Sequence, residues 1–234
     1  MKIYQNILKC IAENEKGLAI LIDPEKFEIE GIVDFLNQIP QETTHFFIGG
    51  STGSTSETEA VVIAIKSQSN LPVILFPGDY LQITAKADGI LFLSLHSGRN
   101  AEYLIGQQVK SISRLKDTSL EIIPTSYLLI DGGNQSAVAR VSKTSPISQL
   151  DVETIVHTAL AGQYMGAKLI YLEAGSGANF PIKSEVIQAV KQVIHIPLLV
   201  GGGIKSEFQK QKAYDAGADI VIMGTAFEKQ NAKV

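Results

Sequence analysis

Short apolar runs alternate with longer, partly polar segments along the whole chain. Most of these runs lack a regular alternation of polar and apolar residues, which is typical of strands that are covered on both faces. The segments between them carry apolar residues at spacings of three and four, as helices packed against a sheet do. The candidate strands are 18–22, 45–49, 73–76, 89–94, 121–130, 169–174, 198–202 and 219–224.

Repeated strand–helix units predict a parallel sheet. Since eight runs are present, the pattern predicts an α/β fold of the (β/α)8 or TIM-barrel type. A barrel of this kind needs roughly 250 residues, and the 234 residues of this chain show no linker-like change in composition. We therefore predict a single domain over 1–234. The expected helices include an amphipathic N-terminal helix and 56–68, 152–166, 183–194 and 206–217.

The segment 125–146 departs from the simple repeat. It contains Asp131-Gly132-Gly133-Asn134 between two β-favouring runs, which predicts either a hairpin or an extended loop before a helix that begins near Asp151. Long loops at the end of a barrel strand often carry function.

Composition excludes several classes of protein. The formal net charge of −4 argues against a nucleic-acid partner, because no broad basic surface is available for phosphates. A single cysteine, Cys10, excludes an internal disulfide and a cysteine-based metal cluster. The chain has no signal-peptide pattern and no run of the roughly 20 apolar residues of a transmembrane segment. We therefore expect a cytoplasmic protein.

Glycines follow the seventh and eighth candidate strands. Barrels of this class carry their chemistry at the carboxyl ends of the strands and often bind phosphate with the loops after these two strands. Glycine lets backbone N–H groups approach an oxyanion closely, because no Cβ intervenes. Gly201, Gly202, Gly203, Gly224 and Thr225 therefore predict a phosphate site, whereas the alternative is that these glycines only form tight turns.

Two carboxylates lie at other strand ends. Glu173, in the sixth, is expected to accept a hydrogen bond from a substrate hydroxyl or to act as a base, unless it only pairs with a structural cation. Asp23, in the first, faces the hydroxyl-rich loop with Ser51 and Thr52, and a Mg²⁺ bridging to substrate phosphates would suit this pair. An ordinary Asp-Pro turn is the alternative for Asp23.

Several chemistries find no support in the sequence. No lysine stands at a strand end, which argues against a Schiff base, and there is no HxH, HExxH, GxxxxGK[ST] or helix-opening GxGxxG pattern. His45, His157 and His195 lie at strand starts or in a helix and are expected to be structural. His96 alone lies near the predicted mouth.

Taken together, the strand ends resemble the geranylgeranylglyceryl phosphate synthase family, which includes bacterial heptaprenylglyceryl phosphate synthases. LIDPEK, FIGGSTGS, VILFPG, YLEAGSGAN, LLVGGGIKS and GADIVIMGT occur in family order between residues 21 and 225. YLEAGSG is the most specific of these motifs. Position 21 is leucine, whereas one branch of the family has lysine there, so this chain looks like the branch typical of larger assemblies.

The resemblance implies Mg²⁺-dependent transfer of a prenyl group, geranylgeranyl or similar, from a prenyl diphosphate to the 3-hydroxyl of sn-glycerol 1-phosphate. It also implies a homo-oligomer, either a dimer or a hexamer. Asp23 and Ser51 look like the metal contacts, and Glu173 looks like the catalytic residue. The glycerol-phosphate site then consists of Tyr171, Leu172, Glu173, Ala174, Gly175, Ser176, Gly177, Gly202, Gly203, Gly224 and Thr225.

The prenyl chain requires an apolar groove, for which Leu81, Ile83, Leu93 and Tyr103 are candidates, although each of them is as well explained by core packing. Two other functions remain open at this point. One is a sugar-phosphate isomerase or epimerase that uses Asp23 and Glu173 as an acid/base pair. The other is a non-catalytic protein that binds phosphoglycerol or prenyl diphosphate.

Overall fold

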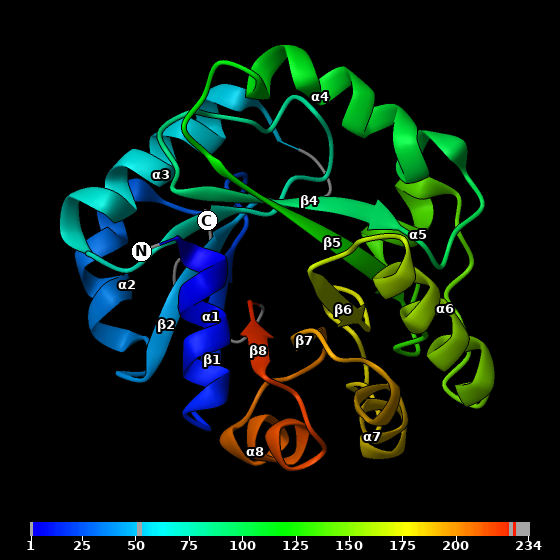
Figure 1. The fold of residues 1–234 in the computed structure, drawn as a ribbon. Coiled ribbons are helices and arrows are strands. Elements are labelled where there is room, and N and C mark those ends of the chain that lie inside the picture. The colour runs from blue at the N-terminus through cyan, green and yellow to red at the C-terminus, as the bar shows by residue number, and fades with distance from the viewer. Residues whose placement is uncertain (1, 51–52, 225–226, 228–234) are drawn as a thin grey trace.

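The computed structural model describes residues 2–50, 53–224 and 227. They form a closed barrel of parallel strands that pair in chain order, with β8 returning beside β1 (Figure 1). This confirms the predicted fold class. Every strand overlaps one of the apolar runs: β1 (Gly17–Ile22), β2 (Thr43–Ile48), β3 (Val73–Leu75), β4 (Gly89–Leu95), β5 (Glu121–Leu129), β6 (Leu169–Glu173), β7 (Leu198–Gly201) and β8 (Ile220–Met223).

The helices surround the barrel in Figure 1, and the expected helical segments are confirmed. Local capping explains where several of them begin. At the start of α3, the Ser54 hydroxyl accepts from the N–H of Glu57 at 3.2 Å, and the Glu57 carboxylate accepts from the N–H of Ser54 at 2.9 Å. The helices are α1 (Ile3–Ala12), α2 (Ile32–Gln38), α3 (Thr55–Gln68), α4 (Gln107–Leu115), α5 (Ala137–Ser142), α6 (Val152–Tyr164), α7 (Ser184–Val193) and α8 (Glu207–Asp215). A 3₁₀-helical turn, η1 (Ile29–Gly31), precedes α2, and a π-helical segment, η2 (Glu102–Gly106), leads into α4.

The apolar core has two layers because successive strand residues face opposite sides. In β1, Ile20 and Ile22 pack outward against the helices, whereas Ala19 packs inside the barrel. The inner layer also receives Ile3 and Ile7 of α1, so this helix closes the amino-terminal end of the barrel. The carboxyl-terminal end is thereby left as the side on which a substrate can enter.

The connection from β3 to β4, residues 76–88, contains no helix. A regular βα repeat predicts one here, so the barrel departs from the ideal pattern at this position. The segment FPGDYLQITAKAD includes Pro77 and Gly78 two and three residues after the end of β3, and this pair does not favour helix formation. The side of the barrel that a helix would cover is instead bordered by a loop.

The segment after β5 forms an extended loop with one short helix, α5, and no hairpin. A parallel bridge between Ile130 and Ile147 closes the loop at its base. Its first part packs on the loop after β6, where the carbonyl of Gly132 accepts from the N–H of Asn179 at 2.9 Å. Of the two forms that the sequence allowed for this segment, the loop is therefore the one that is present.

Candidate active site

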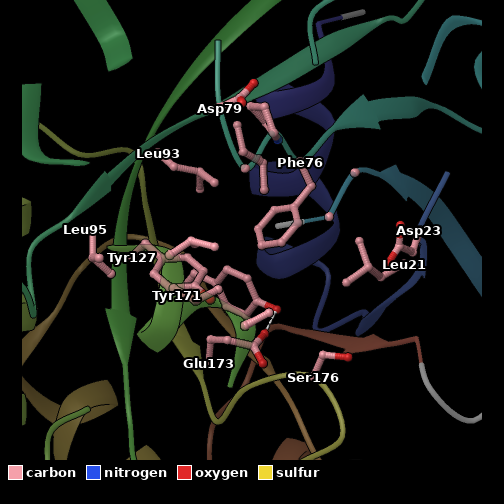
Figure 2. A pocket seen from close by; sticks show the side chains of 18 of the residues that line it. Leu21, Asp23, Phe76, Asp79, Leu93, Leu95, Tyr127, Tyr171, Glu173 and Ser176 are labelled. Atoms are coloured by element: carbon pink, nitrogen blue, oxygen red, sulfur yellow. Dashed lines mark hydrogen bonds between the residues drawn. The ribbon is translucent and has the colours of Figure 1, made fainter. Parts of the chain in front are cut away.

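A cavity of about 390 Å³ opens at the carboxyl ends of the strands. Figure 2 shows Asp23 and Leu21 on one side of it, Leu93 and Leu95 on another, and Glu173 with Tyr171 between them. Part of the cavity lining is apolar. This part, here called the groove, consists of Ile83, Ile90, Leu91, Phe92, Leu93 and Tyr103.

Glu173, the last residue of β6, is buried at the floor of the cavity. One carboxylate oxygen, Oε1, accepts a hydrogen bond from the N–H of Gly175 at 2.6 Å, and the other, Oε2, accepts one from the hydroxyl of Tyr171. No lysine or arginine pairs with this carboxylate among the described residues. Burial raises the pKa of Glu173 above its usual value, although the hydrogen bonds from Tyr171 and Gly175 partly offset this effect.

Aromatic side chains wall the cavity around this carboxylate. The ring of Tyr171 meets the rings of Tyr127 and Phe76 edge-on, with centroids 5.2 and 5.5 Å away. Such edge-to-face contacts favour a fixed ring orientation. The pKa of the Tyr171 hydroxyl is raised well above its usual value, because the group is buried and lies beside the Glu173 carboxylate. Tyr171 therefore stays protonated and donates to Glu173.

Glycines at the ends of β6 and β7 meet above Glu173. Gly175, Gly177, Gly202 and Gly203 all have positive φ, between 71° and 98°, a region that side chains disfavour. A Cβ on Gly202 would lie 2.4 Å from Oε1 of Glu173 and 2.7 Å from the backbone nitrogens of Ala174 and Gly175. Glycine at position 202 is thus required by the close contact between the loops after β6 and β7. We call Gly175, Gly177, Gly202 and Gly203 the glycine cradle.

Asp23 lies across the cavity mouth, directly after β1. Its side chain is 15% exposed, and its Oδ2 lies 3.0 Å from Nζ of Lys26. A Cβ on Gly50, after β2, would lie 3.0 Å from Oδ1 of Asp23, so the two strand ends are in close contact. Leu21, at the position where one branch of the family has lysine, also lines the cavity. The positive charge beside Asp23 in this chain comes from Lys26.

The donor set at Asp23 can be compared with the needs of a divalent ion. No group of three or more histidine, cysteine, aspartate or glutamate residues gathers anywhere in the described part of the chain. This does not suit a cage built by protein alone. The single carboxylate of Asp23, which lines the cavity, suits Mg²⁺. This ion usually keeps several waters and is held by one or two carboxylates together with substrate phosphates.

The structure brings most of the predicted site residues to the cavity. Asp23, Tyr171, Glu173, Ser176, Gly202, Gly203 and Gly224 line it, whereas Gly175 and Gly177 lie in the turn beside it. The side chains of Leu172 and Ala174 are buried in the outer core layer, so only their backbone faces the cradle. Ser51 and Thr225, together with Thr52, lie outside the described residues.

Two residues expected near the cavity, Leu81 and His96, lie elsewhere. Leu81 does not line the cavity and is exposed beside the start of α3, whereas Ile83, Leu93 and Tyr103 do line it. His96 does not line the cavity either. Its Nδ1 lies 2.7 Å from the Ser126 hydroxyl, and a Cβ on Gly162 of α6 would lie 3.1 Å from the same nitrogen. His96 therefore packs between the barrel and α6.

Sequence reasoning missed several residues of the cavity. Phe76 and Tyr127 lie within apolar runs and look like ordinary core residues, although the register of β5 and β6 pairs Tyr127 directly with Tyr171. Among the described residues, three cations also line the cavity, namely Lys26, Arg140 and Lys205. A signal was available for Lys26, which lies within the LIDPEK strand-end motif, but Arg140 reaches the mouth only because α5 folds back over it.

A closed parallel barrel with a glycine cradle, a buried carboxylate and a groove defines the class: a (β/α)8 barrel protein with a glycine-lined cavity at the carboxyl ends of its strands. The PcrB family model matches residues 11–234. The geranylgeranylglyceryl phosphate synthase of Zunongwangia profunda is 58% identical over 232 residues, which are 99% of each chain. The chain therefore belongs to the PcrB family, as the resemblance of its motifs indicated.

More distant relatives agree. The geranylgeranylglyceryl phosphate synthase of Thermococcus kodakarensis is 44% identical over 220 residues, 93% of this chain and 86% of the relative. The crystal structure of (S)-3-O-geranylgeranylglyceryl phosphate synthase from Thermoplasma acidophilum, in complex with its substrate sn-glycerol-1-phosphate, superposes with a TM-score of 0.90 at 37% identity. That match covers 98% of this chain and 92% of the other.

Proposed function

We propose that this protein transfers a geranylgeranyl or similar prenyl group from a prenyl diphosphate to the 3-hydroxyl of sn-glycerol 1-phosphate. The observation that carries the proposal is the lining of the cavity: polar groups around Glu173 and the glycine cradle share one cavity with the apolar side chains of the groove. One polar acceptor and one apolar donor fit such a site. The names of the relatives and the glycerol-phosphate complex of the Thermoplasma acidophilum enzyme support the same assignment.

The acceptor end follows from the cradle. The phosphate of sn-glycerol 1-phosphate lies against the backbone of Gly202, Gly203 and Gly224, which line the cavity. Its 3-hydroxyl is then directed at the carboxylate of Glu173. Holding two reactants in a productive orientation contributes to the rate by removing much of the entropy cost of their encounter.

The donor end follows from the groove and Asp23. The prenyl chain extends along Ile83, Leu93 and Tyr103, and the diphosphate lies at the mouth beside Asp23 and Lys26. Mg²⁺, held by Asp23 with water and diphosphate oxygens, would neutralise the negative charge that develops on the leaving group. The predicted contact from Ser51 lies outside the described residues.

Glu173 orients the acceptor hydroxyl and accepts its proton as the oxygen attacks the first carbon of the prenyl chain. The hydroxyl of Tyr171 stays protonated and holds Oε2, and the N–H of Gly175 holds Oε1, so the carboxylate is fixed in place and accepts the substrate hydroxyl through a remaining lone pair. The aromatic wall of Phe76, Tyr127 and Tyr171 excludes water from the developing allylic cation. A sugar-phosphate isomerase would not need the apolar groove, which favours the transferase.

A direct assay tests the proposal. The protein is incubated with sn-glycerol 1-phosphate, geranylgeranyl diphosphate and Mg²⁺, and the ether product and released diphosphate are quantified. Saturable binding of both ligands without product would indicate the non-catalytic binding protein instead. Conversion of a sugar phosphate without any prenyl donor would indicate the isomerase.

Asp23→Asn is expected to raise the Mg²⁺ concentration needed for half-maximal activity by about tenfold or more, because a neutral amide binds the hard cation poorly. The measurement is activity against Mg²⁺ concentration. The exposed Asp34, which lies in the first turn of α2 away from the cavity, provides the matched control Asp34→Asn. An unchanged Mg²⁺ dependence in Asp23→Asn would contradict the assignment of this residue.

Leu93→Trp is expected to raise KM for geranylgeranyl diphosphate several-fold while leaving the affinity for sn-glycerol 1-phosphate within about twofold, because Leu93 lines only the apolar part of the cavity. Steady-state kinetics with each substrate varied in turn provide the measurement. Ile63→Trp, on the exposed face of α3, is the control. An equal effect on both substrates would show that the groove is not the donor site.

We further propose that the protein is cytoplasmic and forms a homo-oligomer, a dimer or a hexamer. No helix among the described residues is long and apolar enough to cross a membrane. Exposed apolar side chains occur on one face of the η2–α4 segment, at Ile105, Val109 and Ile112, which would suit burial against another subunit. Analytical ultracentrifugation of the whole chain tests the assembly.

A further inference from the structure

The carboxylate of Asp23 forms an ion pair with the side chain of Lys26. Nζ of Lys26 lies 3.0 Å from Oδ2 of Asp23 at the cavity mouth. The two residues are joined by a turn, in which the N–H of Lys26 donates to the Asp23 carbonyl at 3.1 Å and the N–H of Glu25 donates to Oδ1 at 3.2 Å. Pro24 occupies the second position of the turn, where its restricted φ is favourable.

The position of Lys26 is determined on its other side by packing. The next residue, Phe27, is buried and meets Phe35 of α2 edge-on with ring centroids 5.1 Å apart. The backbone at Lys26 is therefore held between a proline turn and an aromatic anchor. Its side chain is half-exposed and lines the cavity, so its ammonium group can move over the mouth while its backbone stays in place.

The other two cations of the cavity are differently placed. Nζ of Lys205, after β7, lies 3.0 Å from the carbonyl of Ala178, on the side of the glycine cradle. Arg140 belongs to α5, in the loop after β5. Lys26 is thus the cation of the cavity that directly contacts the carboxylate at the donor end.

We propose that Lys26 is a diphosphate-binding residue that exchanges partners as the donor enters: it pairs with Asp23 in the free protein and with the diphosphate of the donor in the complex. The proposal rests on the function proposed above. A divalent ion on Asp23 and the ammonium of Lys26 repel each other, so both cannot keep the same carboxylate oxygen. The incoming diphosphate supplies the alternative anion, and the flexible lysine side chain reaches it without a change in the backbone.

This exchange has two consequences. Lys26 keeps the Asp23 carboxylate compensated until metal and donor arrive together, which favours binding of the Mg²⁺–diphosphate pair over binding of either alone. It also leaves one fixed positive charge beside the leaving diphosphate when the bond to the prenyl carbon breaks, where such a charge stabilises the departing anion.

Calorimetric titration with inorganic pyrophosphate tests the proposal, with and without Mg²⁺, on the wild-type protein and on Lys26→Gln and Lys26→Arg. Lys26→Gln is expected to weaken pyrophosphate binding about tenfold, because a charge-assisted hydrogen bond is lost. Lys26→Arg is expected to stay within about threefold of the wild type. The loss in Lys26→Gln should be larger with Mg²⁺ than without it, because the metal then takes over Asp23 and frees the lysine for pyrophosphate, whereas without the metal the lysine remains paired with Asp23.

Two controls separate this role from a structural one. Lys9→Gln removes another lysine that pairs with an acid within its own segment, Glu13 at 3.8 Å, on the outside of α1, and it should leave pyrophosphate binding unchanged. Thermal unfolding shows whether Lys26→Gln is still folded. If Lys26→Gln does not fold, Lys26→Arg, which keeps the positive charge, is compared with the wild type instead. Wild-type affinity for pyrophosphate in a folded Lys26→Gln protein would overturn the proposal.

The result can be interpreted independently of the main assignment. Product formation by the wild-type protein tests the transferase function, whereas the pyrophosphate titrations test Lys26 alone. An active wild type with unchanged pyrophosphate binding in Lys26→Gln contradicts only the role of the lysine.

Discussion

Glu173→Gln is expected to lower kcat for prenyl transfer by roughly 10²- to 10⁴-fold, the range typical of losing a general base. Glutamine has nearly the same shape, and it can keep both local contacts if its oxygen accepts from the N–H of Gly175 and its amide faces the oxygen of Tyr171. What it cannot do is accept a proton from the acceptor hydroxyl. The affinity for sn-glycerol 1-phosphate should therefore change much less than kcat.

Single-turnover rates and calorimetric binding of sn-glycerol 1-phosphate provide the measurements for this variant. Glu185→Gln, at the exposed start of α7, is the control for a lost carboxylate that is not in the cavity. Glu173→Gln should unfold at no lower temperature than the wild type, because it removes a buried carboxyl group whose ionisation is costly. Near-normal kcat in Glu173→Gln would exclude this residue as the base.

The same residue determines the pH dependence on the acid side. Because burial raises the pKa of Glu173, the carboxyl becomes protonated at a higher pH than an ordinary glutamate does. A protonated carboxyl cannot accept the hydroxyl proton, so kcat falls as the pH is lowered through this raised pKa. The fall should be absent from the residual activity of Glu173→Gln.

Gly202→Ala is the second change with a large expected effect. The backbone at Gly202 has a φ of +79°, and an added Cβ would lie 2.4 Å from Oε1 of Glu173 and 2.7 Å from two backbone nitrogens of the β6 loop. None of these atoms belongs to a flexible exposed side chain, so the strain cannot be relieved cheaply. We expect a loss of about 2–4 kcal/mol in the free energy of unfolding, as the sum of an unfavourable φ and overpacking.

Loss of glycerol-phosphate binding should accompany the loss of stability, because the Cβ occupies the cradle and displaces the carboxylate that orients the acceptor. Urea denaturation and calorimetric titration with sn-glycerol 1-phosphate measure the two effects. Gly166→Ala is a well-matched control: its φ of +97° is also positive, but no heavy atom lies within 4 Å of an added Cβ. The difference between the variants then reports the collision alone, and equal behaviour would contradict the cradle.

The fold was largely predictable because each strand of the barrel is buried on both faces. Runs such as 169–174 and 198–202 are continuously apolar for this reason, and they locate the strands without any structure. The sequence indicated no helix at 76–88, although an ideal repeat has one in every connection, and the structure has none there. Position in the repeat says nothing about a connection whose local residues do not favour a helix.

The candidate site was predictable where a residue stands at a strand end. Glu173, Gly202 and Asp23 are adjacent to apolar runs, and the barrel brings all strand carboxyl ends to one face. Leu172 and Ala174 were included with their neighbours in the motif, but the two-residue period of the strand turns their side chains to the outer core. The groove was only partly predictable, since Leu81 and Ile83 differ in exposure although they are two residues apart.

The sequence by itself determined the order of the strands, the glycines that follow them and the two carboxylates at the strand ends, because these depend on the local pattern of residues along the chain. Only the tertiary structure decided the partners of those groups. It brought the rings of Phe76, Tyr127 and Tyr171 together around Glu173, and it showed Lys26 on the carboxylate of Asp23. Closure of the barrel sets such contacts, which join residues from different strands and depend on side-chain direction as well as on position in the chain.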